Sequence, residues 1–419
     1  MNVKKEILVY AHWQSLKEPM LMGTLAVIPA KGNEVFSFEY SDDWLKSGLT
    51  YQIDPDLQLY SGRYFPNEEK MNFGVFLDSC PDRWGRVLME RKEAALARRE
   101  NRPAKNLHES DFLLGVYDGH RMGGLRYKLN VEGDFLNNDK DMASPPWTSL
   151  RELEYASKKF EEDNSNDEEL IKWINLLIAP GSSLGGARPK ASVSDAKNNL
   201  WIAKFPSIKD TKDIGGWEMV VNKLAEMSGL TVAESTVKNF NNSYYTFLTK
   251  RFDRNENGER IHFASAMTML GYKDGDGHGT GVSYLEIAEF LMKNGADVNA
   301  DLEEIWRRIV FYICVKNTDD HLRNHGFLLT EKGWRLSPAY DINPNEFGTG
   351  LSLNISEKDN ALDLELALSV AEYFRVDKPK AVEIINTIKG SVRDWRKVAQ
   401  DLGLSKSEQD KISNAFEHL

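Results

Sequence analysis

The chain has 419 residues, of which 41% are hydrophobic and 28% charged, and its formal net charge is −11. These values are typical of a globular protein, and the length predicts two or three lobes rather than one. A broad nucleic-acid surface needs clustered lysine and arginine side chains. We therefore expect no direct nucleic-acid binding by this chain unless a partner supplies it.

The two cysteines, Cys80 and Cys314, lie far apart and show no metal-site spacing, so they are expected to be reduced thiols. The first ten residues contain no long apolar stretch of the kind a signal peptide needs. No apolar run approaches the roughly 20 residues of a transmembrane helix. The expected location is the cytoplasm, without membrane contact.

Residues 1–135 are predicted to form a β-rich subdomain that also contains a helix. Alternating or apolar patterns predict three strands, at residues 7–13, 23–27 and 35–40. The stretch that begins at Phe73 leads into a charged helix that ends at about Arg99. Residues 130–148 hold polar residues and two prolines, which indicates a linker.

A glycine-rich turn at residues 181–193 is the first stretch that suggests nucleotide chemistry. Helices are predicted at residues 150–160 and 170–178, with an acidic run between them that reads as a solvated loop. Glycines in the turn allow close backbone approach, and exposed N–H groups can hold phosphates. The strand at residues 200–205 then places Lys204 where its ammonium could reach a nucleotide.

A helix over residues 217–227 and an apolar strand over residues 244–254 follow. In a kinase a helix glutamate pairs with the strand lysine, and both Glu218 and Glu226 are candidates for this role. The apolar strand has the position of a kinase hinge. Backbone groups near Lys250 and Phe252 are expected to meet adenine.

The stretch around residues 317–341 carries the strongest chemical signal. Helices are predicted at about residues 262–270, 283–293 and 301–316, and the last one leads directly into it. Asp319 is followed by Asn324, then by a predicted hairpin, and then by Asp341. This order is that of a phosphotransferase catalytic loop, in which the first aspartate orients and deprotonates the acceptor hydroxyl. Asn324 and Asp341 would supply hard oxygen ligands to magnesium.

Taken in order, these stretches predict an ATP-dependent kinase. The expected fold class is α+β, with a two-lobed, protein-kinase-like architecture, an N-terminal β-rich subdomain and an all-helical C-terminal lobe. The kinase N-lobe is predicted at residues 150–255 and the C-lobe at residues 256–419. The expected cofactors are ATP and Mg²⁺.

The sequence resembles the HipA-like kinases, the toxin components of type II toxin–antitoxin systems. The resemblance covers nearly the whole chain, and its most specific stretches are residues 183–190, 204–206, 251–254, 319–326 and 338–341. It implies a serine/threonine protein kinase whose fold is similar to those of eukaryotic-type and phosphatidylinositol 3/4-kinases.

The resemblance also implies roles for single residues. Asp319 would be the catalytic base, Asn324 and Asp341 the magnesium ligands, and Lys204 the contact to the α- and β-phosphates. The turn over the nucleotide would consist of Leu184, Gly185, Gly186, Ala187, Arg188, Pro189 and Lys190. Ser183 has the position of an autophosphorylated serine, and the adjacent Ser182 is an alternative. Phosphate added there would repel ATP or displace the turn, so autophosphorylation is expected to inactivate the enzyme.

Two departures from better-known members stand out. Arg188-Pro189 replaces glutamine and an acidic residue, and Pro189 removes one amide donor. Arg323 occupies a position often filled by lysine, and its guanidinium keeps the charge needed for a γ-phosphate contact.

Three functions remain open. The first is a toxin kinase that phosphorylates a component of translation, such as an aminoacyl-tRNA synthetase, and is neutralised by a small helix-turn-helix, HipB-like antitoxin. The second is a kinase of a small molecule or lipid on the same fold. The third is a non-catalytic ATP-binding interaction module.

Overall fold

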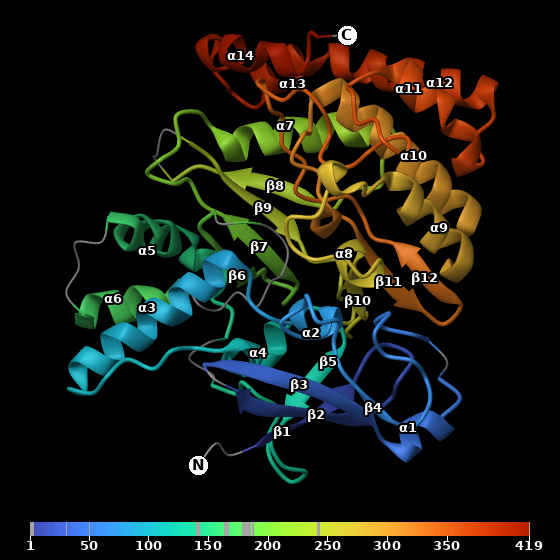
Figure 1. The fold of residues 1–419 in the computed structure, drawn as a ribbon. Helices are drawn as coiled ribbons and strands as arrows, with labels where there is room; N and C mark the ends of the chain where they lie inside the picture. Colours follow the sequence, from blue (N-terminus) through green and yellow to red (C-terminus); the bar gives the residue numbers. More distant parts are fainter. Residues whose placement is uncertain are drawn as a thin grey trace. The chain divides into compact units, whose positions relative to one another are not determined.

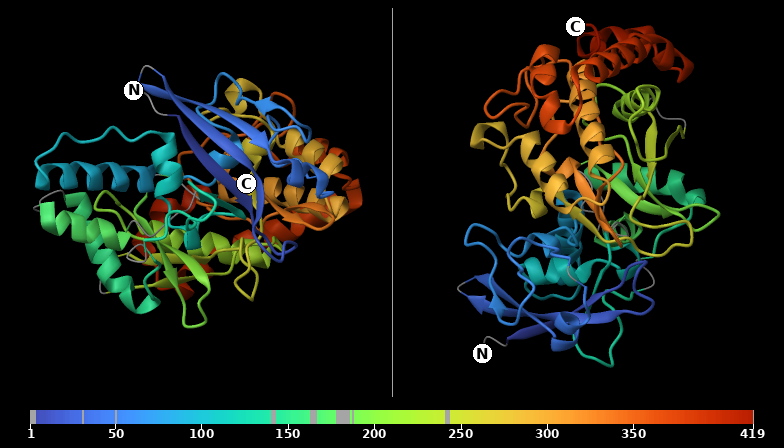
Figure 2. Two further views of the ribbon diagram at one scale, coloured as in Figure 1. Left: turned by 90° about the horizontal axis from the view of Figure 1, so that it is seen from below. Right: turned by 90° about the vertical axis from the view of Figure 1, so that its right-hand side faces the viewer.

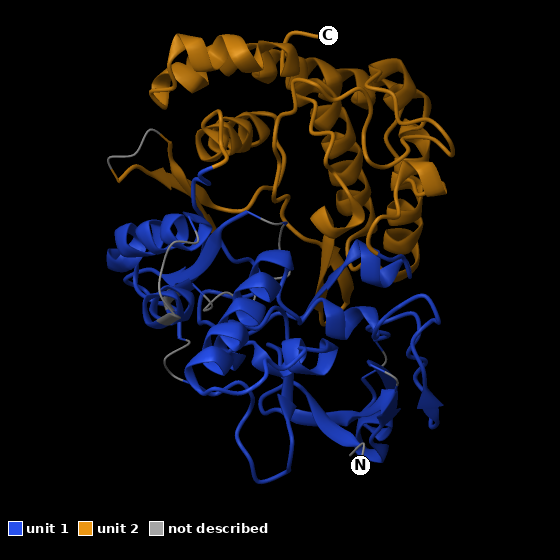
Figure 3. Cartoon of the chain, turned by 60° about the vertical axis from the view of Figure 1, so that its left-hand side comes forward, with its two compact units in different colours: residues 1–208, 250–273 blue, residues 209–249, 274–419 orange. Residues whose placement is uncertain are grey.

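The chain forms two compact units (Figure 3). Unit 1 comprises residues 1–208 and 250–273, and unit 2 comprises residues 209–249 and 274–419. The computed structural model describes residues 4–30, 32–49, 51–139, 143–162, 167–177, 186, 188–240 and 244–418.

The N-terminal part of unit 1 is a five-stranded antiparallel sheet (Figure 1). The strand order is β4-β3-β2-β1-β5. The bounds are β1 Lys5–Ala11, β2 Met20–Ala30, β3 Asn33–Tyr40, β4 Arg63–Tyr64 and β5 Leu125–Lys128. From Ile7 onward every second residue of β1 is buried, as the period of a half-buried strand requires. All three strands predicted here are present, and β2 is longer than predicted.

The longer helices of unit 1 pack on one another, and α5 and α6 contact the first strand of the hairpin β6–β7. The bounds are α1 Asp42–Lys46, α2 Gly74–Leu77, α3 Arg83–Arg99, α4 Glu109–Gly115, α5 Leu150–Glu162 and α6 Asp167–Leu177, with the hairpin strands β6 Lys190–Ser194 and β7 Leu200–Lys204. Asp82 caps α3 by accepting from the Gly85 amide at 2.9 Å, which explains why the helix begins there. Trp84 packs edge-on against Phe160 of α5 at 5.1 Å.

Two predictions for unit 1 need correction. The helix expected at residues 262–270 is instead a short strand, β10 Phe263–Ser265, and a single helical turn, α8 Ala266–Met269. Ser265 caps that turn through the Thr268 amide, so the helix cannot begin earlier. The acidic run at residues 161–169 is predicted to be a loop, but residues 161–162 end α5 and residues 167–169 begin α6; residues 163–166 lie outside the described residues.

Unit 2 is mostly helical and is built around α10, Val298–Val315 (Figures 1 and 2). The residues from Arg308 to Val315 are all buried, and α9, α11 and α12 contact this helix. The other bounds are α7 Ile214–Met227, α9 Tyr284–Asn294, α11 Leu364–Ser369, α12 Lys378–Arg393, α13 Trp395–Asp401, α14 Lys406–Ile412, β8 Ser235–Lys238, β9 Thr246–Lys250, β11 Gly326–Thr330 and β12 Gly333–Leu336. The antiparallel pair β11–β12 is the hairpin predicted after Asn324. The predicted C-lobe, residues 256–419, is therefore mostly helical but not all-helical as expected, because it also contains this hairpin and the short strand β10.

The bounds of the two units differ from the predicted bounds of the kinase lobes. Residues 209–249 belong to unit 2, although they fall in the predicted N-lobe. The three predicted segments remain a prediction. Both cysteines are buried free thiols, and no helix of the described residues is long and apolar enough to cross a membrane.

Candidate active site

The predicted catalytic loop begins where α10 ends. Lys316 closes the helix in the left-handed conformation, with φ +49°, and its amide still donates to the Ile313 carbonyl. This reversal sends the chain away from the helix axis. Asn317 is buried directly after it, at 1% exposure, while Asp319 is exposed. The end of the helix therefore presents the Asp319 carboxylate to solvent on a buried support.

Asn324 is held against the backbone of Asp319. Its Nδ2 donates to the Asp319 carbonyl at 3.0 Å, and the residue is 2% exposed. Its Oδ1 is buried and has no hydrogen-bond partner within the described residues. Buried carbonyl oxygens normally have a partner, and an amide oxygen is a ligand that magnesium accepts. The residue thus fits its predicted role.

Asp341 adopts a backbone conformation that few residues other than glycine take. Its φ is +57°, which aspartate tolerates better than most side chains. Its Oδ1 accepts from Asn343 Nδ2 at 3.2 Å. In the parts of the chain that the structure describes, no group of three or more His, Cys, Asp or Glu side chains is placed to hold a metal ion. Asn324 and Asp341 form a smaller oxygen set, which suits magnesium because it keeps several waters.

The electrostatic surroundings of Asp319 suit a base. Partial removal of water raises the pKa of its carboxyl group. The positive charge of His321 lowers it, and the negative charges of Asp341 and Asp320 raise it. The net direction is upward from the ordinary value of 3.8. A carboxylate with a raised pKa is a stronger proton acceptor.

A buried polar cluster beneath the loop was not predicted from the sequence. Asp320 Oδ2 accepts from the Tyr284 hydroxyl at 2.6 Å and lies 2.7 Å from His325 Nε2. All three residues are buried. The cluster ties both ends of the loop to α9 and fixes the loop between them. The repeated charged and histidine residues of the loop were the available signal, but nothing in the sequence indicates Tyr284.

The segment after Asp341 is fastened to the loop as well. The Asn343 amide donates to Asn317 Oδ1 at 3.1 Å, and Asn345 Nδ2 donates to Thr318 Oγ1 at 2.8 Å. The Ser352 hydroxyl donates to the Thr318 carbonyl at 2.8 Å. The structure therefore brings Asp319, Asn324 and Asp341 together within unit 2.

Arg323 is partly exposed and forms an ion pair with Asp274 at 3.1 Å. Its side-chain exposure is 30%, and its carbonyl accepts from the Tyr340 hydroxyl at 2.7 Å. The contact to a γ-phosphate stays a prediction.

The residues predicted to hold the nucleotide lie largely in unit 1. Ser182, Ser183, Leu184, Gly185 and Ala187 lie outside the described residues. Gly186 is exposed, and Arg188 donates from Nη2 to the Phe205 carbonyl at 3.2 Å. Lys204 is buried at the end of β7, with its backbone opposite Lys190 in the hairpin register.

Lys190 anchors the glycine-rich turn to the N-terminal subdomain. Its ammonium lies 2.7 Å from Asp82 Oδ2 and donates to the Gly186 carbonyl at 2.9 Å. Its own carbonyl accepts from the Trp84 indole at 3.1 Å. The side chains of Lys190 and Asp82 are only 2% and 6% exposed, so this contact is a buried ion pair. A direct phosphate contact by Lys190 stays a prediction, and its contacts to Asp82 and Gly186 give the residue a positioning role.

The predicted hinge strand, residues 244–254, contains β9, which is shorter than predicted. Phe252 packs against Phe263 at 5.9 Å, and Lys250 lines a pocket of unit 1. Of the two candidate helix glutamates, Glu218 is buried on α7 and Glu226 is exposed. The pairing of either glutamate with Lys204 stays a prediction.

Comparison with known proteins identifies the family. A family model described as the HipA-like C-terminal domain matches residues 182–396, which is just over half of the chain. The chain belongs to the HipA-like family. This confirms the resemblance drawn from the motifs.

Two curated relatives resemble parts of this HipA-like chain. A protein named "Putative kinase" from Haemophilus influenzae is 26% identical over 180 residues, which cover 39% of this chain and 52% of that protein. Toxin YjjJ of Escherichia coli is 23% identical over 248 residues, which cover 57% of this chain and 51% of that protein. The chain thus spans about half the length of both relatives.

A solved structure matches over nearly the whole HipA-like chain. It is HipA of Shewanella oneidensis, determined in a complex with HipB and its operator DNA. The TM-score is 0.65 at 17% identity, covering 98% of this chain and 94% of that one. The similarity shows the fold, a mixed α+β architecture with a β-rich N-terminal part and a more helical C-terminal part, as predicted.

Proposed function

We propose that this HipA-like chain is an ATP- and magnesium-dependent serine/threonine protein kinase of the cytoplasm. The observation that supports it most directly is the position of Asn324. Its amide nitrogen is used to hold Asp319, and its buried oxygen is left for a ligand. Most buried side-chain polar atoms have a hydrogen-bond partner, so this unpaired oxygen is available to a ligand.

Each residue has a role in this proposal. Asp319 accepts the proton of the acceptor hydroxyl while that oxygen forms a bond to the γ-phosphorus, and the bond to the bridging oxygen breaks to release ADP. Asn324 and Asp341 hold magnesium, which neutralises charge on the phosphates when bound. Lys204 contacts the α- and β-phosphates, Arg323 the γ-phosphate, and residues 184–190 cover the nucleotide. Backbone groups of Lys250 and Phe252 meet adenine.

The test is intact-mass spectrometry of the purified chain after incubation with ATP and magnesium. We expect the wild type to gain phosphate on Ser183 or Ser182, and Asp319→Asn to gain none. Asp401→Asn is the matched control, because it changes another exposed aspartate of unit 2. Absence of both phosphate gain and ADP formation with protein substrates, in a chain that melts normally, would contradict the kinase proposal.

We further infer a toxin role with a translation component, such as an aminoacyl-tRNA synthetase, as substrate and a small helix-turn-helix, HipB-like antitoxin as partner. The name of the Escherichia coli relative and the HipB-bound state of the Shewanella protein support this. Growth arrest on expression should require Asp319 and should be relieved by the antitoxin. Arrest that persists in Asp319→Asn would contradict a kinase-dependent toxin.

A further inference from the structure

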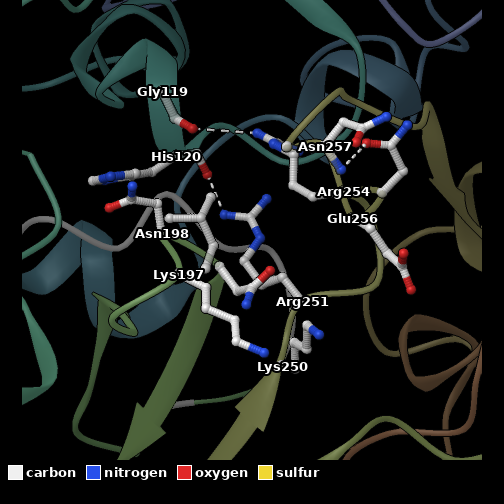
Figure 4. Close-up of a pocket in the computed structure, with 13 residues that line it drawn as sticks. Gly119, His120, Lys197, Asn198, Lys250, Arg251, Arg254, Glu256 and Asn257 are labelled. Atoms are coloured by element: carbon white, nitrogen blue, oxygen red, sulfur yellow. Dashed lines mark hydrogen bonds between the residues drawn. The ribbon is translucent and has the colours of Figure 1, made fainter.

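A polar pocket of about 400 Å³ lies within unit 1 (Figure 4). Its walls come from residues 119–120, the turn at 197–200, residues 250–251 and the turn at 254–258. Leu200 is the one purely aliphatic side chain among them, so the pocket offers little apolar surface for a nucleobase or a lipid chain.

Positive charges outnumber negative ones in the pocket lining. Lys197, Lys250, Arg251 and Arg254 line it, together with Glu256. In the view of Figure 4 the two lysine side chains extend toward the lower part, and Glu256 lies to the right. Lys197 and Glu256 are both exposed, and neither has an ion pair recorded among the described residues.

The two lining arginines share one buried carboxylate. Arg251 Nη2 and Arg254 Nη1 each lie 2.6 Å from Asp253 Oδ2. The Arg251 and Asp253 side chains are fully buried, and that of Arg254 is 8% exposed. Two positive charges of the pocket lining therefore share one negative charge.

The same imbalance continues behind the pocket. Arg126 and Arg260 share Asp118, at 2.6 and 3.4 Å. Arg121, which is also buried, donates to the carbonyls of Ser79, Val116 and Leu136 instead of to a carboxylate. Four guanidinium groups thus make ion pairs with two carboxylates in this part of unit 1, and the fifth, that of Arg121, donates to carbonyls. Arginine does not lose its proton in proteins, so this excess charge cannot be relieved by deprotonation.

The excess has an electrostatic cost that an anion in the pocket would reduce. Burial, opposed by Asp253 and reinforced by the charge of Arg251, lowers the pKa of Arg254 to about 10, which shows that its positive charge is poorly accommodated. Because charges interact more strongly away from water, an anion next to Arg251 and Arg254 gains more than it would at an open surface.

We propose that this pocket binds a small phosphate-bearing anion. Most N–H groups of Arg251 and Arg254 already donate to carbonyl and carboxylate oxygens, so the two arginines act through their charge. Lys197 supplies ammonium donors from the exposed side. Phosphate suits such a site because it carries up to two charges and several acceptor oxygens.

The proposal is independent of the kinase proposal. Among the described residues predicted to contact the nucleotide, Arg188, Lys190, Lys204 and Phe252 do not line this pocket, and Lys250 does. The two sites can therefore be separated by mutation.

The test is calorimetric titration of inorganic pyrophosphate into the full-length chain, without magnesium and with EDTA. We expect binding that Lys197→Glu weakens roughly tenfold and Glu256→Gln strengthens, since the first reverses a favourable charge and the second removes an unfavourable one. Lys158→Glu makes the same charge change at an exposed site of unit 1 that does not line the pocket, and should leave affinity unchanged. Thermal melts confirm that each variant is folded.

A parallel titration with a phosphorylated sugar shows whether the pocket prefers an organic or an inorganic phosphate. Binding of either compound that Lys197→Glu weakens supports the site. Absence of binding in the wild type would overturn the proposal, as would an affinity that is the same in Lys197→Glu. Binding that is lost in Lys204→Met but kept in Lys197→Glu would assign the anion to the nucleotide site and also overturn it.

Discussion

Asp319 combines an exposed position with a raised pKa, and this combination predicts how activity depends on pH. Proton acceptance requires the ionised carboxylate, so the rate should fall on acidification around a pKa above 3.8. His321→Gln removes a group that lowers the pKa of Asp319, and should move the acid limb of kcat/KM to higher pH. Steady-state rates from pH 4 to 8 would check this. An acid limb at the same pH in both proteins would contradict it.

His262 is a buried histidine whose neutral form is favoured. It stacks on Trp13 at 5.0 Å, and burial lowers its pKa to about 3. Between pH 3 and 6.5 the unfolded chain binds this proton and the folded chain does not, so folding stability from this group is lost as the pH falls. Asp54 acts in the opposite direction, because burial raises its pKa to about 6.

The His262 contribution is therefore measured as a difference between proteins. From pH 7 to pH 5 the wild type should lose about 2 kcal/mol more unfolding free energy than His262→Asn. Urea titrations of both proteins at the two pH values give the comparison, in which the Asp54 contribution cancels. Equal losses would show that His262 does not titrate with folding.

At the scale of elements, the catalytic loop is positioned by close contact with the segment that follows Asp341. A Cβ added to Gly348 would lie 2.3 Å from Oγ1 and 2.4 Å from Cγ2 of Thr318. Thr318 is the neighbour of Asp319, so Gly348→Ala must displace the base or the segment. We expect kcat to fall by roughly tenfold to a hundredfold, with a loss of about 1–3 kcal/mol of stability.

Gly390→Ala is the control for this substitution. Nothing lies within 4 Å of an added Cβ there, and the residue is inside α12. Alanine favours helix, so the variant should be more stable by up to about 1 kcal/mol at unchanged kcat. A Gly348→Ala protein with wild-type kcat would show that Thr318 does not transmit the displacement to Asp319.

At the scale of the molecule, unit 2 depends on residues that precede the predicted C-lobe. Trp217 of α7 packs against Trp395 and Phe416, each at 6.1 Å. The Tyr245 hydroxyl donates to the Leu402 carbonyl at 2.8 Å. A fragment of residues 256–419 would lack these partners and expose two large aromatic side chains.

We therefore expect the fragment 256–419 to be poorly folded and the fragment 209–419 to be helical and protease-resistant over most of unit 2. Circular dichroism, dye binding to exposed apolar surface and limited proteolysis would compare them. A cooperatively folding fragment 256–419 would show that α7 is not part of the same folding unit.

The sequence by itself was enough to predict the family, the fold class and most of the strands and helices that carry the candidate site. Lys204 on a strand, the Asp319–Asn324 spacing and the β11–β12 hairpin are local patterns, because neighbouring residues determine turn chemistry and periodicity. The helix expected at residues 262–270 failed because burial and the Ser265 cap outweighed its pattern.

The tertiary structure decided what supports those residues. Tyr284 meets Asp320 across 36 positions, and Lys190 meets Asp82 across 108. The contact of Gly348 with Thr318 and the ion pair of Arg260 with Asp118 are likewise contacts between distant segments. Such contacts depend on how elements pack, and no local pattern encodes them, because the same side chains would be solvated if the segments did not meet.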